Sequence, residues 1–139
     1  GQCGLPGAHE ACAHLETAAM NPVDIPDAHP DARTPCLVLT TVAGEADARR
    51  LARAVVEARL GACVQATPLH STYVWDGAVC EAAEVQLAIK TVVGRYAALE
   101  AFIRERHGYE TPEIVRIPIA AAEARYLRWL VEVCAEHLT

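Results

Sequence analysis

An Asp-Gly pair between two apolar runs is the feature that most constrains how this chain folds. Asp76-Gly77 separates Tyr73-Val74-Trp75 from Ala78-Val79-Cys80. Both central residues of a type I′ turn need a positive φ angle, and Asp-Gly adopts such angles at low cost. The pair therefore predicts an antiparallel hairpin. Its first strand is expected from Ala62 to Trp75, with a bulge or bend at Pro68, because proline cannot donate to a strand ladder.

The return strand alternates between two kinds of side chain, as a strand with one buried face does. One face carries Val85, Leu87 and Ile89, and the other carries Glu84, Gln86, Ala88 and Lys90. The hairpin is thus expected to bury one face and to leave the other more polar.

Apolar residues at helical spacing predict three helices. The first covers about 48–58 and is expected to end near Leu60, where Gly61 would take the left-handed cap. The second follows Gly94 and ends at His107-Gly108, and the third begins at about Ala121.

Two further runs predict strands and complete the order of elements. Residues 36–42 form an apolar, β-branched run, and residues 114–119 alternate, with Pro118 placing that strand at a sheet edge. The order β-α-β-β-α-β followed by a helix is that of an α+β, ferredoxin-like split βαβ fold with an extra C-terminal helix. Because two helices cover only one side of such a sheet, we expect the chain to self-associate.

The first 34 residues differ in composition from the rest. Residues 1–33 hold five acids and one base, whereas 34–139 hold 13 acids and 11 bases, so a nearly neutral domain at 35–139 follows an acidic leader at 1–34. The leader is predicted to be disordered or to be a processed or artificial extension. Met20 is the only methionine, which leaves open whether residues 1–19 are native. The spacing of its Cys and His residues matches no standard zinc module, so a metal role there is the lesser reading.

Composition excludes several classes of protein. A net charge of −6 argues against nucleic-acid binding, and no apolar run approaches the length of a membrane span. The six cysteines form no C-x-x-C pair, and those of the domain are expected to be buried thiols. No Ser or Cys stands near a His in any of the motifs quoted in the next paragraph, so the chain is predicted not to be an enzyme. A cytoplasmic location is expected.

Several motifs together resemble the CutA family of divalent-cation tolerance proteins. The resemblance covers residues 36–133, in order and with the expected spacing. It is carried by Thr40-Thr41, the stretch 60–64 (LGACV), Tyr73-Val74-Trp75-Asp76-Gly77, Ile89-Lys90-Thr91, the stretch 107–114 (HGYETPEI) and Tyr126-Leu127-Arg128-Trp129-Leu130.

The resemblance implies a homotrimer of ferredoxin-like subunits, similar to the PII signalling proteins, whose antiparallel sheets extend across the three subunits. It implies a non-enzymatic protein in divalent metal-ion tolerance that binds copper or other divalent cations such as zinc, with no cofactor required for folding. The alternative is a PII-like regulator that binds a small ligand in the cleft between subunits.

The metal site that the family implies is incomplete in this sequence. The family's cysteine position is Thr40, and the first histidine of its pair is Arg106, so only His107 remains as a ligand. A hydroxyl is a poor ligand for copper, and an arginine brings positive charge to the site. The other reading of His107 is a residue at the C-terminal end of a helix, where the helix dipole favours it.

A second candidate site gathers the polar and aromatic residues of the matching motifs. They are Trp75, Glu84, Lys90, Tyr109, Glu113 and Trp129. If a trimer brings them together, Glu84 and Lys90 would form a partly buried pair beside aromatic walls, as in a ligand cleft. The competing reading is a structural network at the trimer interface.

Overall fold

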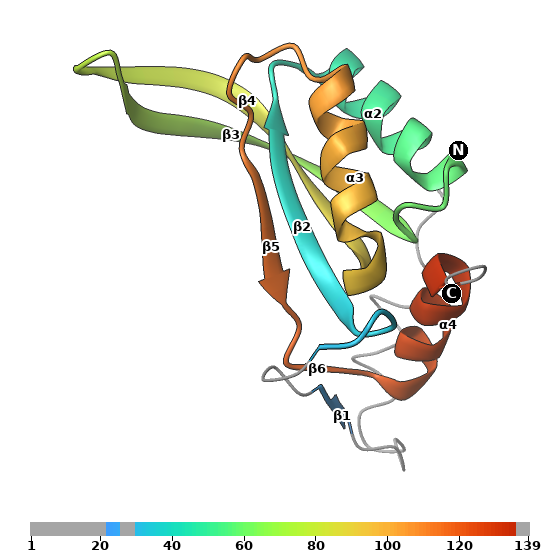
Figure 1. The fold of residues 1–139 in the computed structure, drawn as a ribbon. Coiled ribbons are helices and arrows are strands. Elements are labelled where there is room, and N and C mark those ends of the chain that lie inside the picture. The colour runs from blue at the N-terminus through green and yellow to red at the C-terminus, as the bar shows by residue number, and fades with distance from the viewer. Residues whose placement is uncertain (1–21, 26–29, 136–139) are drawn as a thin grey trace, which may run out of the picture.

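A four-stranded antiparallel sheet organises the chain, which is described here from a computed structural model over residues 22–25 and 30–135 (Figure 1). The strands lie in the order β3-β4-β2-β5. Their bounds are β2 (Pro35–Val42), β3 (Cys63–Trp75), β4 (Ala78–Val92) and β5 (Ile114–Pro118). The predicted ferredoxin-like arrangement is confirmed, and Pro118 lies on an edge strand as expected.

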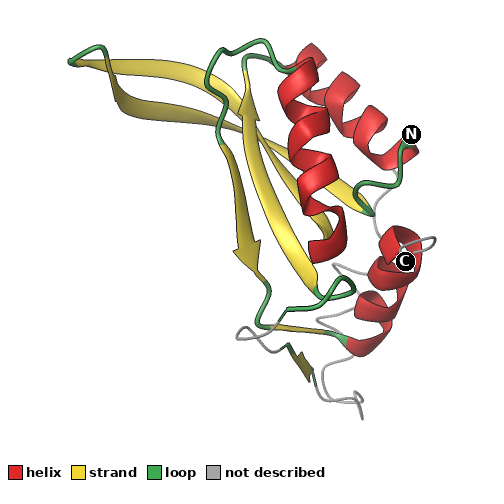
Figure 2. Cartoon of the chain, in the orientation of Figure 1, coloured by secondary structure: helices red, strands yellow, loops and turns green. Residues whose placement is uncertain are grey.

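Helices α2 (Glu45–Glu57) and α3 (Val93–Arg106) cover one face of this sheet (Figure 2). Their apolar sides meet alternate residues of the strands, because successive strand side chains point to opposite faces. The resulting core consists of Val38, Val42, Ala48, Leu51, Val55, Leu60, Leu87, Ile89, Leu99 and Ile103. We call this side of the sheet the covered face and the other side the open face.

The connection from α2 to β3 differs from the prediction in one detail. Arg59, with φ of 59°, takes the left-handed conformation that was expected of Gly61. Gly61 is needed for a different reason, which is close packing. A Cβ atom there would lie 2.7 Å from Cγ2 of Ile89 on β4, so β4 and the α2–β3 connection could not pack as closely as they do.

The hairpin turn is confirmed, with φ of 50° at Asp76 and 75° at Gly77. The bulge expected at Pro68 is absent, since Pro68 pairs with Val85 in an unbroken register. An edge strand tolerates proline because one of its sides has no partner strand. Strand β2 pairs with β4 only as far as Val85, so the outer part of the hairpin is a two-stranded ribbon that projects from the sheet (Figure 1).

Part of the predicted leader pairs with the domain. Val23–Asp24 (β1) pairs with Ala121–Ala122 (β6), and the Ile25 amide donates to the Ala120 carbonyl at 2.7 Å. The prediction of a disordered leader is therefore corrected for residues 22–25, and for 30–34, where the Thr34 carbonyl accepts from the Val93 amide at 2.8 Å. Residues 1–21 and 26–29 lie outside the described residues.

The last helix, α4 (Ala124–Ala135), begins three residues later than predicted because β6 holds the preceding residues in extended form. The Glu123 carboxylate accepts a bond from the Tyr126 amide at 2.8 Å and so caps the helix, which lowers the pKa of that carboxyl. Helix α4 packs at the end of the sheet, where Leu130 and Cys134 contact Ala62 and Val92.

The four cysteines among the described residues are free thiols. Cys36 and Cys134 are buried as predicted, whereas Cys63 and Cys80 are only half-buried. Within residues 22–25 and 30–135, no helix is long and apolar enough to span a bilayer.

Candidate functional site

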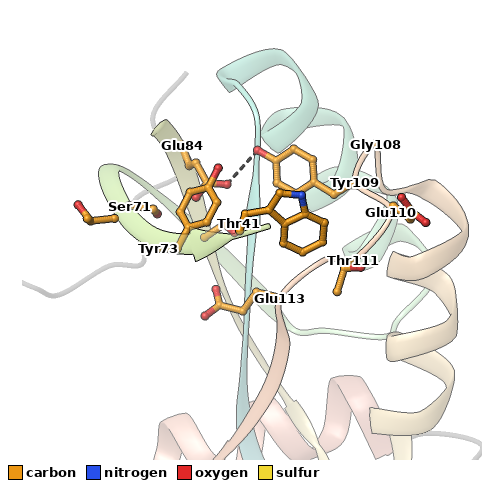
Figure 3. A pocket seen from close by; sticks show the side chains of 11 residues that line it. Thr41, Ser71, Tyr73, Glu84, Gly108, Tyr109, Glu110, Thr111 and Glu113 are labelled. Carbon is orange, nitrogen blue, oxygen red and sulfur yellow. Dashed lines mark hydrogen bonds between the residues drawn. The ribbon is translucent and has the colours of Figure 1, made fainter. Parts of the chain in front are cut away.

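A cavity of about 750 Å³ opens on the open face, between the projecting ribbon and the loop that joins α3 to β5 (Figure 3). Strand alternation directs Thr41 of β2, Tyr73 of β3 and Glu84 of β4 into it. The loop closes the other side. The full lining is Thr41, Ser71, Thr72, Tyr73, Trp75, Glu84, Gly108, Tyr109, Glu110, Thr111 and Glu113.

One hydrogen bond fastens the loop to the sheet across this cavity. The Tyr109 hydroxyl donates to Oε2 of Glu84 at 2.9 Å (Figure 3). Burial, together with the Glu84 carboxylate, raises the pKa of Tyr109 to about 12. Tyr109 is therefore protonated at neutral pH and acts as the donor in this bond.

The ring of His107 is fully engaged by the backbone. Its Nε2 lies 2.7 Å from the Thr41 carbonyl oxygen, and its Nδ1 lies 3.0 Å from the Tyr109 amide. A carbonyl only accepts and an amide N–H only donates, so Nε2 carries the proton and Nδ1 accepts. Both ring nitrogens are thus hydrogen-bonded, and the ring links β2 to the loop.

The other two residues at the implied copper position point elsewhere. Thr40 is fully buried on the covered face, and its hydroxyl has no hydrogen-bond partner among the described residues. The Arg106 guanidinium stacks 3.6 Å above the Phe102 ring. Among residues 22–25 and 30–135, no three His, Cys, Asp or Glu side chains are grouped as metal ligands. Within one chain, these residues do not fit a copper ion.

The structure brings together four of the six residues predicted for a ligand cleft. Trp75, Glu84, Tyr109 and Glu113 line the cavity. Lys90 lies on the same face of β4 but six residues from Glu84, about 20 Å along a strand, and it bonds to Gln65. The Glu84–Lys90 pair is thus not formed within one chain, and a pair between subunits stays a prediction.

Trp129 also lies outside the cavity. It is on α4, where its ring stands 5.6 Å from the ring of Tyr126. The Tyr126 hydroxyl is buried without a partner among the described residues, and burial raises its pKa.

Sequence reasoning missed several residues of the site. Ser71 and Tyr73 could have been found, because they alternate with Trp75 on one side of the predicted hairpin strand. Thr41 could have been found in the same way, because it follows the buried Thr40 and successive strand side chains point to opposite faces. Glu110 and Thr111 lie in a loop that has no periodicity, so no sequence signal placed them beside the sheet.

Comparison with known proteins gives one consistent family. The family model described as CutA1 divalent ion tolerance protein matches residues 36–133. The divalent-cation tolerance protein CutA of Thermus thermophilus is 44% identical over 97 residues, which are 69% of this chain and 94% of that protein. The solved structure of CutA from Synechococcus elongatus superposes with a TM-score of 0.71 at 38% identity, covering 76% of this chain and 94% of that one. CutA1 from Oryza sativa superposes with a TM-score of 0.70 at 34% identity, covering 71% and 92%.

Proposed function

The chain belongs to the CutA1 divalent ion tolerance family, and on this premise we propose that it acts in divalent-cation tolerance as a non-enzymatic homotrimer in the cytoplasm. The observation that carries the proposal is the match over residues 36–133, together with relatives such as the Thermus thermophilus protein that are named for this role. None of the relatives reported above is named for PII signalling, so the PII-like alternative is not favoured.

The projecting ribbon supports self-association. Beyond Val85 the hairpin has only two strands, and an isolated two-stranded hairpin is marginally stable in water. Its tip also exposes apolar side chains, with Val74 at 69% and Val79 at 74% exposure. Strand β3 presents a 13-residue edge, which can pair with a strand of another copy. Contact with further copies would cover these features.

The family name implies contact with divalent cations, but residues 22–25 and 30–135 of one chain do not form a site for them. We therefore propose that copper or zinc is held between copies, and we assign no metal to the folding of a single chain. Half-buried thiols on the open face, Cys63 and Cys80, are the donors that such a shared site would draw on.

Complementation tests the proposed role. The full chain is expressed in a bacterial strain that lacks its own CutA, and growth is measured on inhibitory copper and zinc. We expect tolerance to be restored by this chain and not by Leu87→Asp, which places a charge in the core. Growth equal to that of the empty vector would overturn the role. Light scattering after size exclusion measures assembly, with a trimer expected.

Calorimetric titration of the full chain with Cu(II) and Zn(II) tests the shared site. A matched variant, C3S/H9N/C12S/H14N, removes the ligand-type side chains of the leader. We expect at most one ion per chain in this variant, because a trimer has three equivalent interfaces, and no change on adding His107→Ala. One ion per chain that disappears with His107→Ala would instead establish a single-chain site.

A further inference from the structure

The cavity on the open face is lined by acidic side chains without basic ones. Its lining includes three carboxylates, from Glu84, Glu110 and Glu113, and no lysine, arginine or histidine. Within the described part of the chain, none of the three forms a salt bridge with a basic side chain. The cavity therefore carries negative charge that the described residues do not neutralise, and a ligand of opposite charge would stabilise it.

Aromatic rings line the same cavity. Within one chain Tyr73 is 45% exposed, Trp75 51% and Tyr109 36%, which is high for side chains of this size. The face of an aromatic ring attracts cations, most strongly for Trp and next for Tyr. Figure 3 shows Tyr73 beside Glu84 on the hairpin side, with Glu110 and Thr111 on the facing loop. A ligand between them would meet rings and carboxylates together.

The size of the cavity and the arrangement of its carboxylates favour an organic cation over a metal ion. The volume of about 750 Å³ is within the range of small-molecule pockets, roughly 300–1,000 Å³. Among the described residues, the carboxylates are not grouped closely enough to coordinate an ion. Glu84 is further fixed by the Tyr109 hydroxyl, which uses one acceptor position and leaves the other oxygen for a ligand donor.

We propose that this cavity binds a small organic cation through a primary ammonium or guanidinium group. The aromatic rings contact the cationic head, and Glu84 and Glu113 accept its N–H donors. The proposal goes beyond cation tolerance and does not rest on a metal site, since it assigns a different ligand class to residues that line one chain's own cavity.

Fluorescence of Trp75 provides a direct test. Trp129→Phe leaves Trp75 as the sole tryptophan, because the chain has two and Trp129 lies outside the cavity. The assembled protein is titrated at low salt with n-butylammonium and n-butylguanidinium, and with neutral n-butanol and anionic butyrate as isosteric controls. We expect the cations to bind about three- to thirtyfold more tightly than n-butanol. Added salt should weaken them, because exposed charges are screened.

Matched variants identify the residues responsible. Glu84→Gln keeps an acceptor for Tyr109 but removes the charge, and we expect it and Glu113→Gln each to weaken cation binding about tenfold. Glu81→Gln is the control, because Glu81 is exposed on the same strand outside the cavity lining and should leave binding unchanged.

Three results would overturn the proposal. They are equal binding of n-butanol and the cations, unchanged affinity in both Glu84→Gln and Glu113→Gln, and exclusion of every probe by the assembled protein. The last result would mean that a second copy fills the cavity. Light scattering measures the mass of each variant and so tests the trimer separately. A cavity variant that keeps the mass of the unmodified protein but loses binding has lost its ligand contacts and not its assembly.

Discussion

The two faces of the sheet carry side chains from the same strands but differ in how far those side chains are buried. On the covered face, Val38, Leu87 and Ile89 have no exposure at all. On the open face, their neighbours Leu39, Gln86 and Ala88 stay half-exposed, and one end holds the acidic cavity. One residue along a strand is enough to move from one environment to the other.

This difference separates stability from function within one sheet. The covered face supplies the buried apolar surface that drives folding of the chain. The open face keeps its polar groups accessible in one chain, where a ligand or a further copy can contact them. Substitutions matched across the two faces should therefore differ in size and also in which property they change.

The largest contrast is expected between two leucines on opposite faces. Leu87→Ala should lower the free energy of unfolding by about 2–5 kcal/mol, because it leaves a cavity among the residues that α2 and α3 contact. Leu39→Ala should cost less than about 1.5 kcal/mol, since Leu39 is half-buried in one chain. Urea unfolding at several protein concentrations measures both.

The concentration series adds a second readout. If copies cover the open face, Leu39→Ala should reduce the dependence of the unfolding midpoint on protein concentration, and Leu87→Ala should keep it. Equal costs and equal concentration dependence for the two variants would break the distinction between the faces.

Two glycines give the next contrast. Gly61→Ala should cost about 1–3 kcal/mol, because its Cβ would lie 2.7 Å from Ile89 and 3.1 Å from Val55 in the core. Gly77→Ala meets no atom within 4 Å, but its φ of 75° imposes strain of about 1–2 kcal/mol. Gly108→Ala, which has neither problem, is the control. Thermal melts compare them, and a neutral Gly61→Ala would refute the close packing.

The sequence predicted the covered face better than the open one, for a physical reason. Burial imposes period-2 and helical patterns, so the strands, the helices and the order of the elements could be deduced from residues such as Leu87 and Leu99. The Asp76-Gly77 turn could be deduced because few residue pairs adopt its angles. The pairing of β1 with β6 left no such pattern, since it involves two residues from each strand.

The candidate site was only partly predictable because it depends on contacts between distant segments. Trp75 and Glu84 share the hairpin, and their motifs identified them. The bond from His107 to the Thr41 carbonyl joins residues 66 apart and uses a backbone atom, which side-chain patterns do not reveal. The family motif suggested a ligand role for His107, which stays a prediction, but it did not reveal this link between β2 and the loop.

Two buried threonines on the covered face test how strictly that face excludes polar groups. Thr91 donates to the Leu60 carbonyl at 2.8 Å, so Thr91→Val should cost about 1–3 kcal/mol. The Thr40 hydroxyl has no partner among the described residues, so Thr40→Val should be neutral or stabilising by up to about 1 kcal/mol. Chemical denaturation distinguishes them. A large loss in Thr40→Val would mean that its hydroxyl has a partner.

The smallest contrast appears only at alkaline pH and compares one titrating group from each face. Burial raises the pKa of the Cys36 thiol on the covered face from 9.0 to about 11, and the pKa of Tyr109 at the cavity rises from 10.0 to about 12. A raised pKa means that the folded state holds the proton more tightly. The resulting stability is complete below the unfolded value and is lost as pH rises through the folded value.

Stability should therefore fall between about pH 9 and 11 through Cys36, and between about pH 10 and 12 through Tyr109. Melting temperatures measured from pH 8 to 12 should show a shallower first decline in Cys36→Ala. Tyr109→Phe should remove a smaller part of the second decline, because Tyr109 is 36% exposed and solvent screens its carboxylate neighbour. An identical profile in Cys36→Ala would show that the thiol is solvated, and the covered face would then be less tightly closed than its packing indicates.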